Sequence, residues 1–238
     1  EPKRSLLFME ETNGIWSTPD RVTFRSMFYR QDVPFFSVDG KKLYFISVKP
    51  QQWYQLFSDE GIWYVERKGK RWSGARQVGT KVNELYTHWQ FSVSANGNLY
   101  MAGSEDNEHD IWHIYKSETV NGRYTKPQKL TDSINISNVP IPYSQLSPFI
   151  APDESYLIFS GSGASDSFGR GDLYISYRRK DGSWTRAKNM GNSINTRSME
   201  LCPIISPDGK YLFFMRQETI MWVSAKIIEE LRQTNCIN

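Results

Sequence analysis

The chain of 238 residues has few of the side chains that most often carry chemistry, with two cysteines and three histidines. Cys202 and Cys236 leave open both the redox compartment and a bridge between them. We expect Cys202 to be buried and unreactive, because free cysteine is usually a small core residue. No apolar run reaches the roughly 18–20 residues needed to cross a bilayer. No signal-peptide pattern opens the chain, so we expect any export signal to have been removed or never to have existed.

An excess of charge of one sign is also missing. The 29 basic residues nearly balance the 26 acidic ones, and both are scattered along the chain. Nucleic-acid-binding domains are typically more basic and gather their charges on one face, so no nucleic-acid partner is expected. Aromatic residues are abundant at 14% of the chain, which suits β-sheets faced with large flat side chains. The length is typical of one all-β domain, which we place at residues 1–238.

One hairpin pattern recurs along the chain: an apolar strand, a short polar turn and a second apolar strand. Its copies occupy residues 34–45, 91–101, 148–159 and 202–214. Their turns carry Asp39-Gly40, Asn96-Gly97, Asp153-Glu154 and Asp208-Gly209. Asp-Gly and Asn-Gly between β-rich runs predict hairpins, because these residues tolerate the positive φ of a type I′ turn. A hairpin that returns about every fifty residues indicates a repeat architecture.

Two further elements recur in the same order after the hairpin. The first is a strand of alternating large apolar and polar residues, at 61–68, 110–117, 172–179 and 220–226. The second is an aromatic residue followed by Ser or Thr, at Trp16, Trp72, Tyr124 and Trp184, with connectors at 79–83, 131–135 and 191–195. Four antiparallel strands per repeat are typical of a β-propeller blade. Helical spacing occurs only in a C-terminal tail at 225–233.

The number of blades follows from how the two ends of the chain are used. The first outer strand precedes the first hairpin, and the last repeat ends after its third strand. If the strand at 14–19 completed the last blade, the ring would have four blades and no free sheet edge. The additional strand at 5–11 favours five blades, the first lacking its inner strands. We favour five and keep four as the alternative.

The third and fourth hairpins resemble a known family. SPDGKYLFF (206–214), APDESYLIF (151–159) and the following DLYISYRRKDGSW (172–184) are similar to the Pro-Asp, WD-like propeller repeats of the TolB type. The resemblance extends from residue 34 to about residue 226. The first two copies depart from it, with Val38-Asp39 and Ala95-Asn96 in place of Pro-Asp. The resemblance implies an exported bacterial propeller, periplasmic or extracellular, that binds partners, and it implies no catalytic residue.

Propellers bind ligands at the axial mouth, where the inner strands begin. Alignment of the four hairpins places Gln31, His88, Gln145 and Glu200 in one column, with Asp32 in the next column and three tyrosines two residues earlier, Tyr29, Tyr86 and Tyr143. Such a ring could hold a polar ligand or ordered water, or its members could simply satisfy one another. The tyrosines could form a rim that binds sugar or peptide, or they could pack between blades.

The leading functional hypothesis is a non-enzymatic recognition module that binds a protein or a glycan at the axial face, without cofactor or metal. The alternative is a carbohydrate-active hydrolase or lyase that uses Glu200, Asp32 and His88 around a metal ion or water. Glycosidases need two carboxylates about 5–10 Å apart, and the only carboxylates expected at the mouth are those of Glu200 and Asp32. The chain has no G-x-S-x-G motif, and its acidic loop at 104–110 matches no EF-hand or zinc pattern. The ligand and the oligomeric state stay open.

Overall fold

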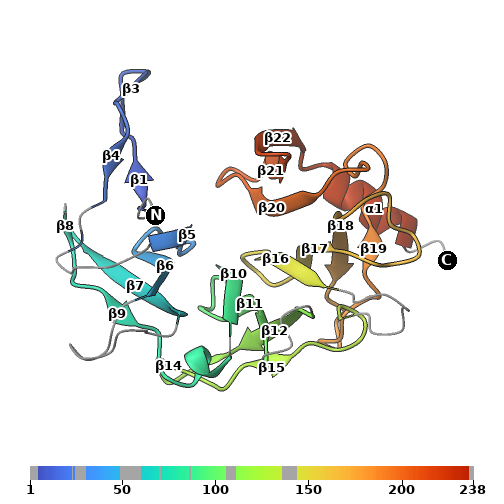
Figure 1. The fold of residues 1–238 in the computed structure, drawn as a ribbon, viewed down its shortest axis with the longest axis horizontal. Helices are drawn as coiled ribbons and strands as arrows, with labels where there is room; N and C mark the ends of the chain where they lie inside the picture. Colours follow the sequence, from blue (N-terminus) through green and yellow to red (C-terminus); the bar gives the residue numbers. More distant parts are fainter. Residues whose placement is uncertain are drawn as a thin grey trace.

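The computed structural model describes residues 5–22, 24, 31–48, 60–69, 71–85, 87–105, 111–135 and 144–235. The protein is an all-β propeller whose antiparallel sheets, or blades, stand around a common axis (Figure 1). Blade 1 contains β5 (Gln31–Phe36), β6 (Lys42–Val48), β7 (Glu60–Lys68), β8 (Arg71–Trp72) and β9 (Arg76–Gln77). Blade 2 contains β10 (Thr87–Val93), β11 (Leu99–Ser104), β12 (His113–Ser117) and β15 (Gln128–Lys129).

The two C-terminal blades follow the same order. Blade 3 contains β16 (Gln145–Ile150), β17 (Tyr156–Gly161), β18 (Asp172–Tyr177) and β19 (Lys188–Asn189). Blade 4 contains β20 (Glu200–Ile205), β21 (Tyr211–Arg216) and β22 (Thr219–Ser224). The apolar faces of neighbouring blades pack against each other, so the core consists of clusters such as the one that joins Tyr100 and Ile114 of blade 2 to Phe159 and Tyr174 of blade 3.

The described sheets form four blades, which is the alternative count and not the favoured five. The N-terminal strands do not complete the last blade, because β1 (Leu7–Phe8) pairs with β4 (Asp20–Arg21) and β2 (Glu11–Thr12) pairs with β3 (Ile15–Trp16). The outer half of blade 2 has the same nested pairing, β12 with β15 and β13 (Thr119–Val120) with β14 (Arg123–Tyr124). In Figure 1, these N-terminal strands and blade 4 lie at the two ends of the arc of blades.

The predicted positions of the outermost strands and of the C-terminal helix need correction. The outermost strands that pair with β7, β12 and β18 are β9, β15 and β19, which begin four residues after the aromatic positions Trp72, Tyr124 and Trp184. The C-terminal helix α1 (Ile227–Asn235) begins two residues later than predicted and packs Ile228 against Leu212 and Phe214 of blade 4. Among the described residues, no helix has both the length and the apolar character needed to cross a membrane.

The hairpin turns differ from the predicted type I′. In blade 1 the amide of Gly40 donates to the carbonyl of Ser37 at 2.8 Å, and only Gly40 has a positive φ, of 66°. This geometry is a turn of type I followed by one residue in the left-handed region. The carboxylate of Asp39 accepts hydrogen bonds from the Ser37 hydroxyl and the Lys41 amide, which explains why aspartate recurs in these turns.

The connectors between blades are held by one asparagine each. The side chain of Asn195 accepts from the amide of Leu173 at 2.8 Å and donates to the carbonyl of the same residue at 2.9 Å. Asn135 makes the same pair of bonds with Ile114, at 2.8 and 2.9 Å. The amide of Ile62 donates to Asn83 at 3.0 Å. The side-chain amide therefore replaces a strand as the partner at the start of the third strand of each of these blades.

A buried carboxylate joins blades 2 and 3. Glu154 lies in the left-handed region with a φ of 60° and has 2% of its surface exposed. From blade 2 it accepts hydrogen bonds from Ser94, Asn98 and Tyr100 at 3.0, 2.6 and 3.0 Å and forms an ion pair with Lys116 at 3.4 Å. Arg178 of its own blade also donates to it. A non-glycine residue in this conformation costs about 1–2 kcal/mol, and these contacts offset the cost.

We expect Asn195→Ala to lower the free energy of unfolding by about 1–3 kcal/mol, because it leaves the buried amide of Leu173 without a partner, while the carbonyl of Leu173 keeps its bond from the amide of Met190. Urea unfolding followed by circular dichroism measures the loss. The matched control is Asn96→Ala, since Asn96 is exposed on a turn and should change stability by less than about 0.5 kcal/mol. Equal stabilities of the two variants would contradict the role of the connector asparagine.

The stability contributed by Glu154 should depend on pH. Burial alone raises the pKa of this carboxyl, but the hydrogen bonds from Asn98 and Ser94 and the charge of Lys116 outweigh burial and hold the pKa below its ordinary value. A lowered pKa in the folded state gives stability that is present above the unfolded value of about 4.3 and is lost as the pH falls through the folded value.

We therefore expect Glu154→Gln to be less stable than the wild type by about 1.5–3 kcal/mol at pH 7, with a difference that shrinks toward pH 3. Urea unfolding of both proteins across this pH range checks the expectation. A difference that is independent of pH would show that the charge of the carboxylate does not contribute.

Candidate functional site

The four aligned polar positions occupy the same place in the structure. Gln31, His88, Gln145 and Glu200 pair across the inner hairpins with Ser47, Gly103, Gly161 and Arg216. The inner strands β5, β10, β16 and β20 face the axis in Figure 1. The side chains of Gln31, Gln145 and Glu200 are buried, and Asp32 is partly buried beside Gln31. The structure therefore places these residues at equivalent strand starts, while their binding of a ligand stays a prediction.

Some of the predicted site cannot be placed. Tyr29, Tyr86 and Tyr143 lie outside the described residues, and so does the side chain of His88. Cys236 and most of the acidic loop at 104–110 are outside them too. Within the described part of the chain, no group of three or more His, Cys, Asp or Glu residues is arranged to hold a metal ion.

Glu200 is the most firmly held of the predicted residues. Its Oε1 accepts hydrogen bonds from the Thr196 hydroxyl and from Nε of Arg216, both at 2.7 Å. Its Oε2 accepts from the amide of Thr196 at 3.2 Å. Arg216 also donates to the carbonyl of Ile194 in the connector. With both oxygens engaged and no exposed surface, Glu200 joins the first strand of blade 4 to the connector that precedes it.

Gln145 differs from Glu200 because half of its amide has no partner. Its Oε1 lies 3.0 Å from Nδ1 of His113, and since an amide oxygen only accepts, His113 donates. Burial lowers the pKa of His113 below its ordinary value, although the hydrogen bond to Gln145 acts in the opposite direction. The Nε2 of Gln145 is buried without a hydrogen-bond partner among the described residues.

The inner strands contain a second polar layer that the sequence alignment missed. Each inner strand has a bulge directly after its first two residues, for example between Leu146 and Phe149 and between Leu201 and Ile204. The bulge residues Val33, Ser147 and Cys202 have φ values of 51°, 54° and 55°. Each of these three precedes a proline, Pro34, Pro148 or Pro203, which lacks an amide donor and is therefore tolerated at a bulge or sheet edge.

Gln90 of blade 2, two residues after His88, stands in the same column as Val33, Ser147 and Cys202, and its side chain reaches across the axis. Its Nε2 lies 2.8 Å from Sγ of Cys202 in blade 4. Cys202 is a free thiol that is only partly buried, which corrects the expectation of a buried cysteine. The Oε1 of Gln90 and the Oγ of Ser147 are buried without partners in the described structure. The signal that could have found this layer is the column two residues after the aligned polar positions, where Gln90, Ser147 and Cys202 are polar and two of the three precede a proline.

Comparisons with known proteins identify the fold. No family model and no curated protein matches the chain. A structure assigned to TolB of Agrobacterium tumefaciens is similar, with a TM-score of 0.57, 16% identity and coverage of 89% of this chain and 63% of that one. A puromycin-hydrolyzing peptidase of Mycobacterium tuberculosis gives a TM-score of 0.51 and 14% identity over 89% of this chain and 35% of that one.

A third similar structure is a periplasmic gluconolactonase of Pseudomonas aeruginosa, with a TM-score of 0.53 and 13% identity over 92% of this chain and 60% of that one. The chain thus spans between 35% and 63% of the length of these three structures. The likenesses include proteins whose described activities differ, and at these identities they show the propeller fold alone.

The contacts of Glu200 predict a structural effect for its removal. We expect Glu200→Ala to lower the melting temperature by about 6–20 °C, because the variant leaves Arg216 without its buried carboxylate partner, a loss of about 3–5 kcal/mol. Differential scanning calorimetry measures the change. Lys210→Ala, which removes an exposed turn residue, is the control. If Glu200→Ala melts at the same temperature as the control, Glu200 is not needed for stability, and the result would favour a role in ligand binding instead.

Proposed function

We propose that the chain is a non-enzymatic recognition propeller that binds a polar group of a protein or a glycan at its axial face. The observation that carries the proposal is a set of buried atoms on the inner strands that have no hydrogen-bond partner among the described residues, Oε1 of Gln90, Nε2 of Gln145 and Oγ of Ser147. A buried polar atom without a hydrogen bond costs about 1–3 kcal/mol. Such atoms gathered on neighbouring inner strands support a place where a ligand or ordered water completes the hydrogen bonding.

The partner and the location are proposed on the likeness to TolB. The Pro-Asp hairpins of blades 3 and 4 and the similarity to a TolB structure support an exported protein, periplasmic or extracellular, that binds a protein. A glycan is retained because amide and hydroxyl groups at an axial mouth can hydrogen-bond to sugar hydroxyls as well as to peptide.

The alternative of a carbohydrate-active hydrolase or lyase has less support. A general acid needs a proton that it can pass to the substrate, and the carboxylate of Glu200 is occupied by Arg216 and Thr196. The gluconolactonase likeness concerns the fold and transfers no activity to this chain. We therefore retain the binding module as the proposed function.

The proposal is tested with two defined probe sets, a printed panel of oligosaccharides and a displayed library of random dodecapeptides. Binders selected on the wild type should bind Gln145→Met about tenfold more weakly, because the variant removes an amide that can donate to the ligand. The melting temperature should fall by only about 2–4 °C, since the substitution removes one internal hydrogen bond.

Lys210→Ala is again the control and should retain the affinity of the wild type, because Lys210 lies on an exposed turn of blade 4. The proposal is wrong if neither probe set yields a specific binder, or if Gln145→Met binds every selected ligand as tightly as the control.

A further inference from the structure

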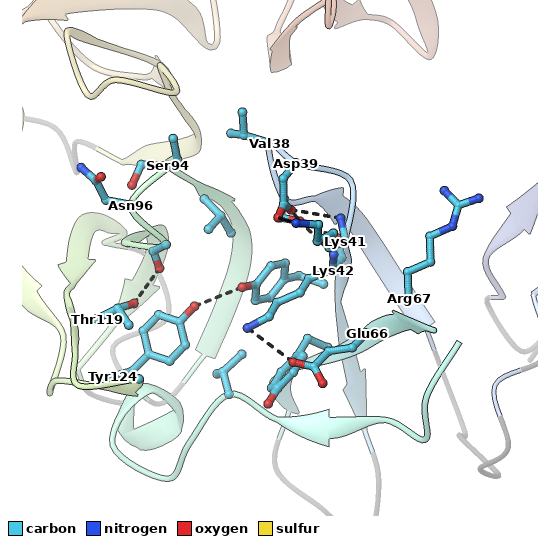
Figure 2. Close-up of a pocket in the computed structure, with 18 of the residues that line it drawn as sticks. Val38, Asp39, Lys41, Lys42, Glu66, Arg67, Ser94, Asn96, Thr119 and Tyr124 are labelled. Atoms are coloured by element: carbon cyan, nitrogen blue, oxygen red, sulfur yellow. Dashed lines mark hydrogen bonds and ion pairs between the residues drawn. The ribbon is translucent and has the colours of Figure 1, made fainter. Parts of the chain in front are cut away.

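A cavity of about 620 Å³ lies between blades 1 and 2 (Figure 2). Its walls come from the hairpin turns at 37–42 and 94–97 and from the outer strands near Tyr64 and Tyr124. The inner strands begin at the axial mouth and reach these turns at their far ends, so the cavity is at the opposite end of the blades from Gln145. The proposed axial site and this cavity are therefore separate features.

The repeats show what fills the corresponding place between blades 2 and 3. In each hairpin, the amide of the left-handed residue donates to the carbonyl three residues earlier, and these residues are Gly40, Gly97, Glu154 and Gly209. Gly97 of blade 2 is thus the counterpart of Glu154 of blade 3. The carboxylate of Glu154 extends into blade 2, whereas Gly97 has no side chain to extend into blade 1.

Blade 1 nevertheless keeps polar groups at the positions that hold Glu154 in blade 2. By strand register and turn hydrogen bonds, Ser94, Asn98, Tyr100 and Lys116 of blade 2 correspond to Ser37, Lys42, Tyr44 and Tyr64 of blade 1. Blade 3 faces Gly209 of blade 4. The residues of blade 3 at the corresponding four positions are Ala151, Tyr156, Ile158 and Ile175. These positions are therefore largely apolar in blade 3 and polar in blade 1, where the Ser37 hydroxyl already donates to Asp39 and leaves Lys42, Tyr44 and Tyr64 as the candidate donors.

The donors in the cavity have capacity for a further partner. The hydroxyls of Tyr44 and Tyr124 lie 3.3 Å apart, and one of their two protons is enough for the bond between them. Burial raises the pKa of Tyr44 well above its ordinary value, so its hydroxyl stays protonated. Lys42 Nζ lies 4.9 Å from the centroid of the Tyr64 ring and 3.7 Å from Glu66, and the second distance is longer than a direct hydrogen bond.

The charge of the cavity wall also suits an anion. Four basic side chains line it, Lys41, Lys42, Arg67 and Lys68, against the two carboxylates of Asp39 and Glu66. In Figure 2, Lys42 and Tyr124 point toward the centre of the cavity, while Arg67 points away from it. Lys42 is therefore the cation best placed to meet a ligand inside.

We infer that this cavity binds a carboxylate supplied from outside the chain, in the place that the carboxylate of Glu154 occupies between blades 2 and 3. Lys42 and Tyr44 donate to it, as Asn98 and Tyr100 donate to Glu154. The carboxylate belongs either to a small organic acid or to an acidic side chain of a peptide. The inference does not depend on the axial site.

The first experiment compares two capped amino acids on the wild-type protein, N-acetyl-glutamate methylamide and its neutral isostere N-acetyl-glutamine methylamide. Nuclear magnetic resonance follows the backbone amides of Lys42 and Gly97 during each titration. We expect saturable shifts with the glutamate probe and at least tenfold weaker binding of the glutamine probe, because a hydrogen bond to a charged group is the stronger one. Succinate and a capped pentapeptide with a central glutamate then distinguish a small acid from a peptide as the tighter ligand.

The second experiment supplies the missing side chain. A Cβ on Gly97 would meet its nearest atom, Oγ1 of Thr119, at 3.4 Å, an ordinary contact. Glu154 shows that glutamate is accommodated in this backbone conformation. We expect Gly97→Glu to abolish binding of the glutamate probe, because its own carboxylate fills the site. Gly97→Ala carries the same backbone strain without a carboxylate and should retain binding.

Lys42→Met and Tyr44→Phe should each weaken binding of the glutamate probe about tenfold, and the melting temperature of each variant confirms that it is folded. The inference is overturned if the wild type shows no saturable shift, if it binds both capped amino acids equally, or if Gly97→Glu binds as tightly as Gly97→Ala. The comparison of the two probes on the wild type requires no variant, so it tests whether the cavity prefers a carboxylate even if a variant does not fold.

Discussion

The fold depends on one asparagine in each connector, whose side-chain amide makes the hydrogen bonds that a neighbouring strand would otherwise make. The outermost strands β9, β15 and β19 are only two residues long, so they cannot pair with the whole length of the third strand. Asn83, Asn135 and Asn195 take over at the start of that strand, each directly after a buried Val82, Ile134 or Ile194. The amide and the buried side chain together hold the connector against its own blade.

The axis is built from strands whose inner edge has no neighbour in the ladder. Prolines and bulges suit such an edge, because they remove or redirect the amides that would otherwise seek a partner. What remains at the axis are side chains, and they are used differently in each blade. Glu200 is committed to Arg216 and the connector, whereas Gln145 and Gln90 each have one side-chain amide atom that finds no partner in the part of the chain that the structure describes. Equivalent positions in a repeat therefore do not imply equivalent roles.

Local patterns in the sequence predicted the hairpins, the third strands and the propeller fold, because alternation of apolar residues and Asp-Gly turns act over a few neighbouring residues. The alignment also placed Gln31, Gln145 and Glu200 at equivalent strand starts. It could not predict the partners of these residues, because Arg216 and His113 belong to other strands of the sheet. Glu154 was interpreted only as a turn residue, since its carboxylate acts on the neighbouring blade. The predicted ring closure, in which the strand at 14–19 completes the last blade, failed for a related reason, because β3 pairs with β2 rather than with blade 4.

The repeats allow one backbone position to be compared in four surroundings. Three blades have glycine in the left-handed turn position, and one has glutamate. Glutamate there costs about 1–2 kcal/mol in backbone energy, so it persists only where a set of donors offsets the cost, as Ser94, Asn98 and Tyr100 do. By the same reasoning, Lys42 and the buried Tyr44 of blade 1 lie opposite a glycine, without the carboxylate that their counterparts Asn98 and Tyr100 bind. Opposite Gly209, three of the four positions in blade 3 are apolar, namely Ala151, Ile158 and Ile175, whereas opposite Gly97 all four positions in blade 1 are polar. The interface of blades 1 and 2 therefore differs from that of blades 3 and 4 in the side chains around the same turn. The polar set in blade 1 is the reason for proposing a carboxylate ligand in the cavity.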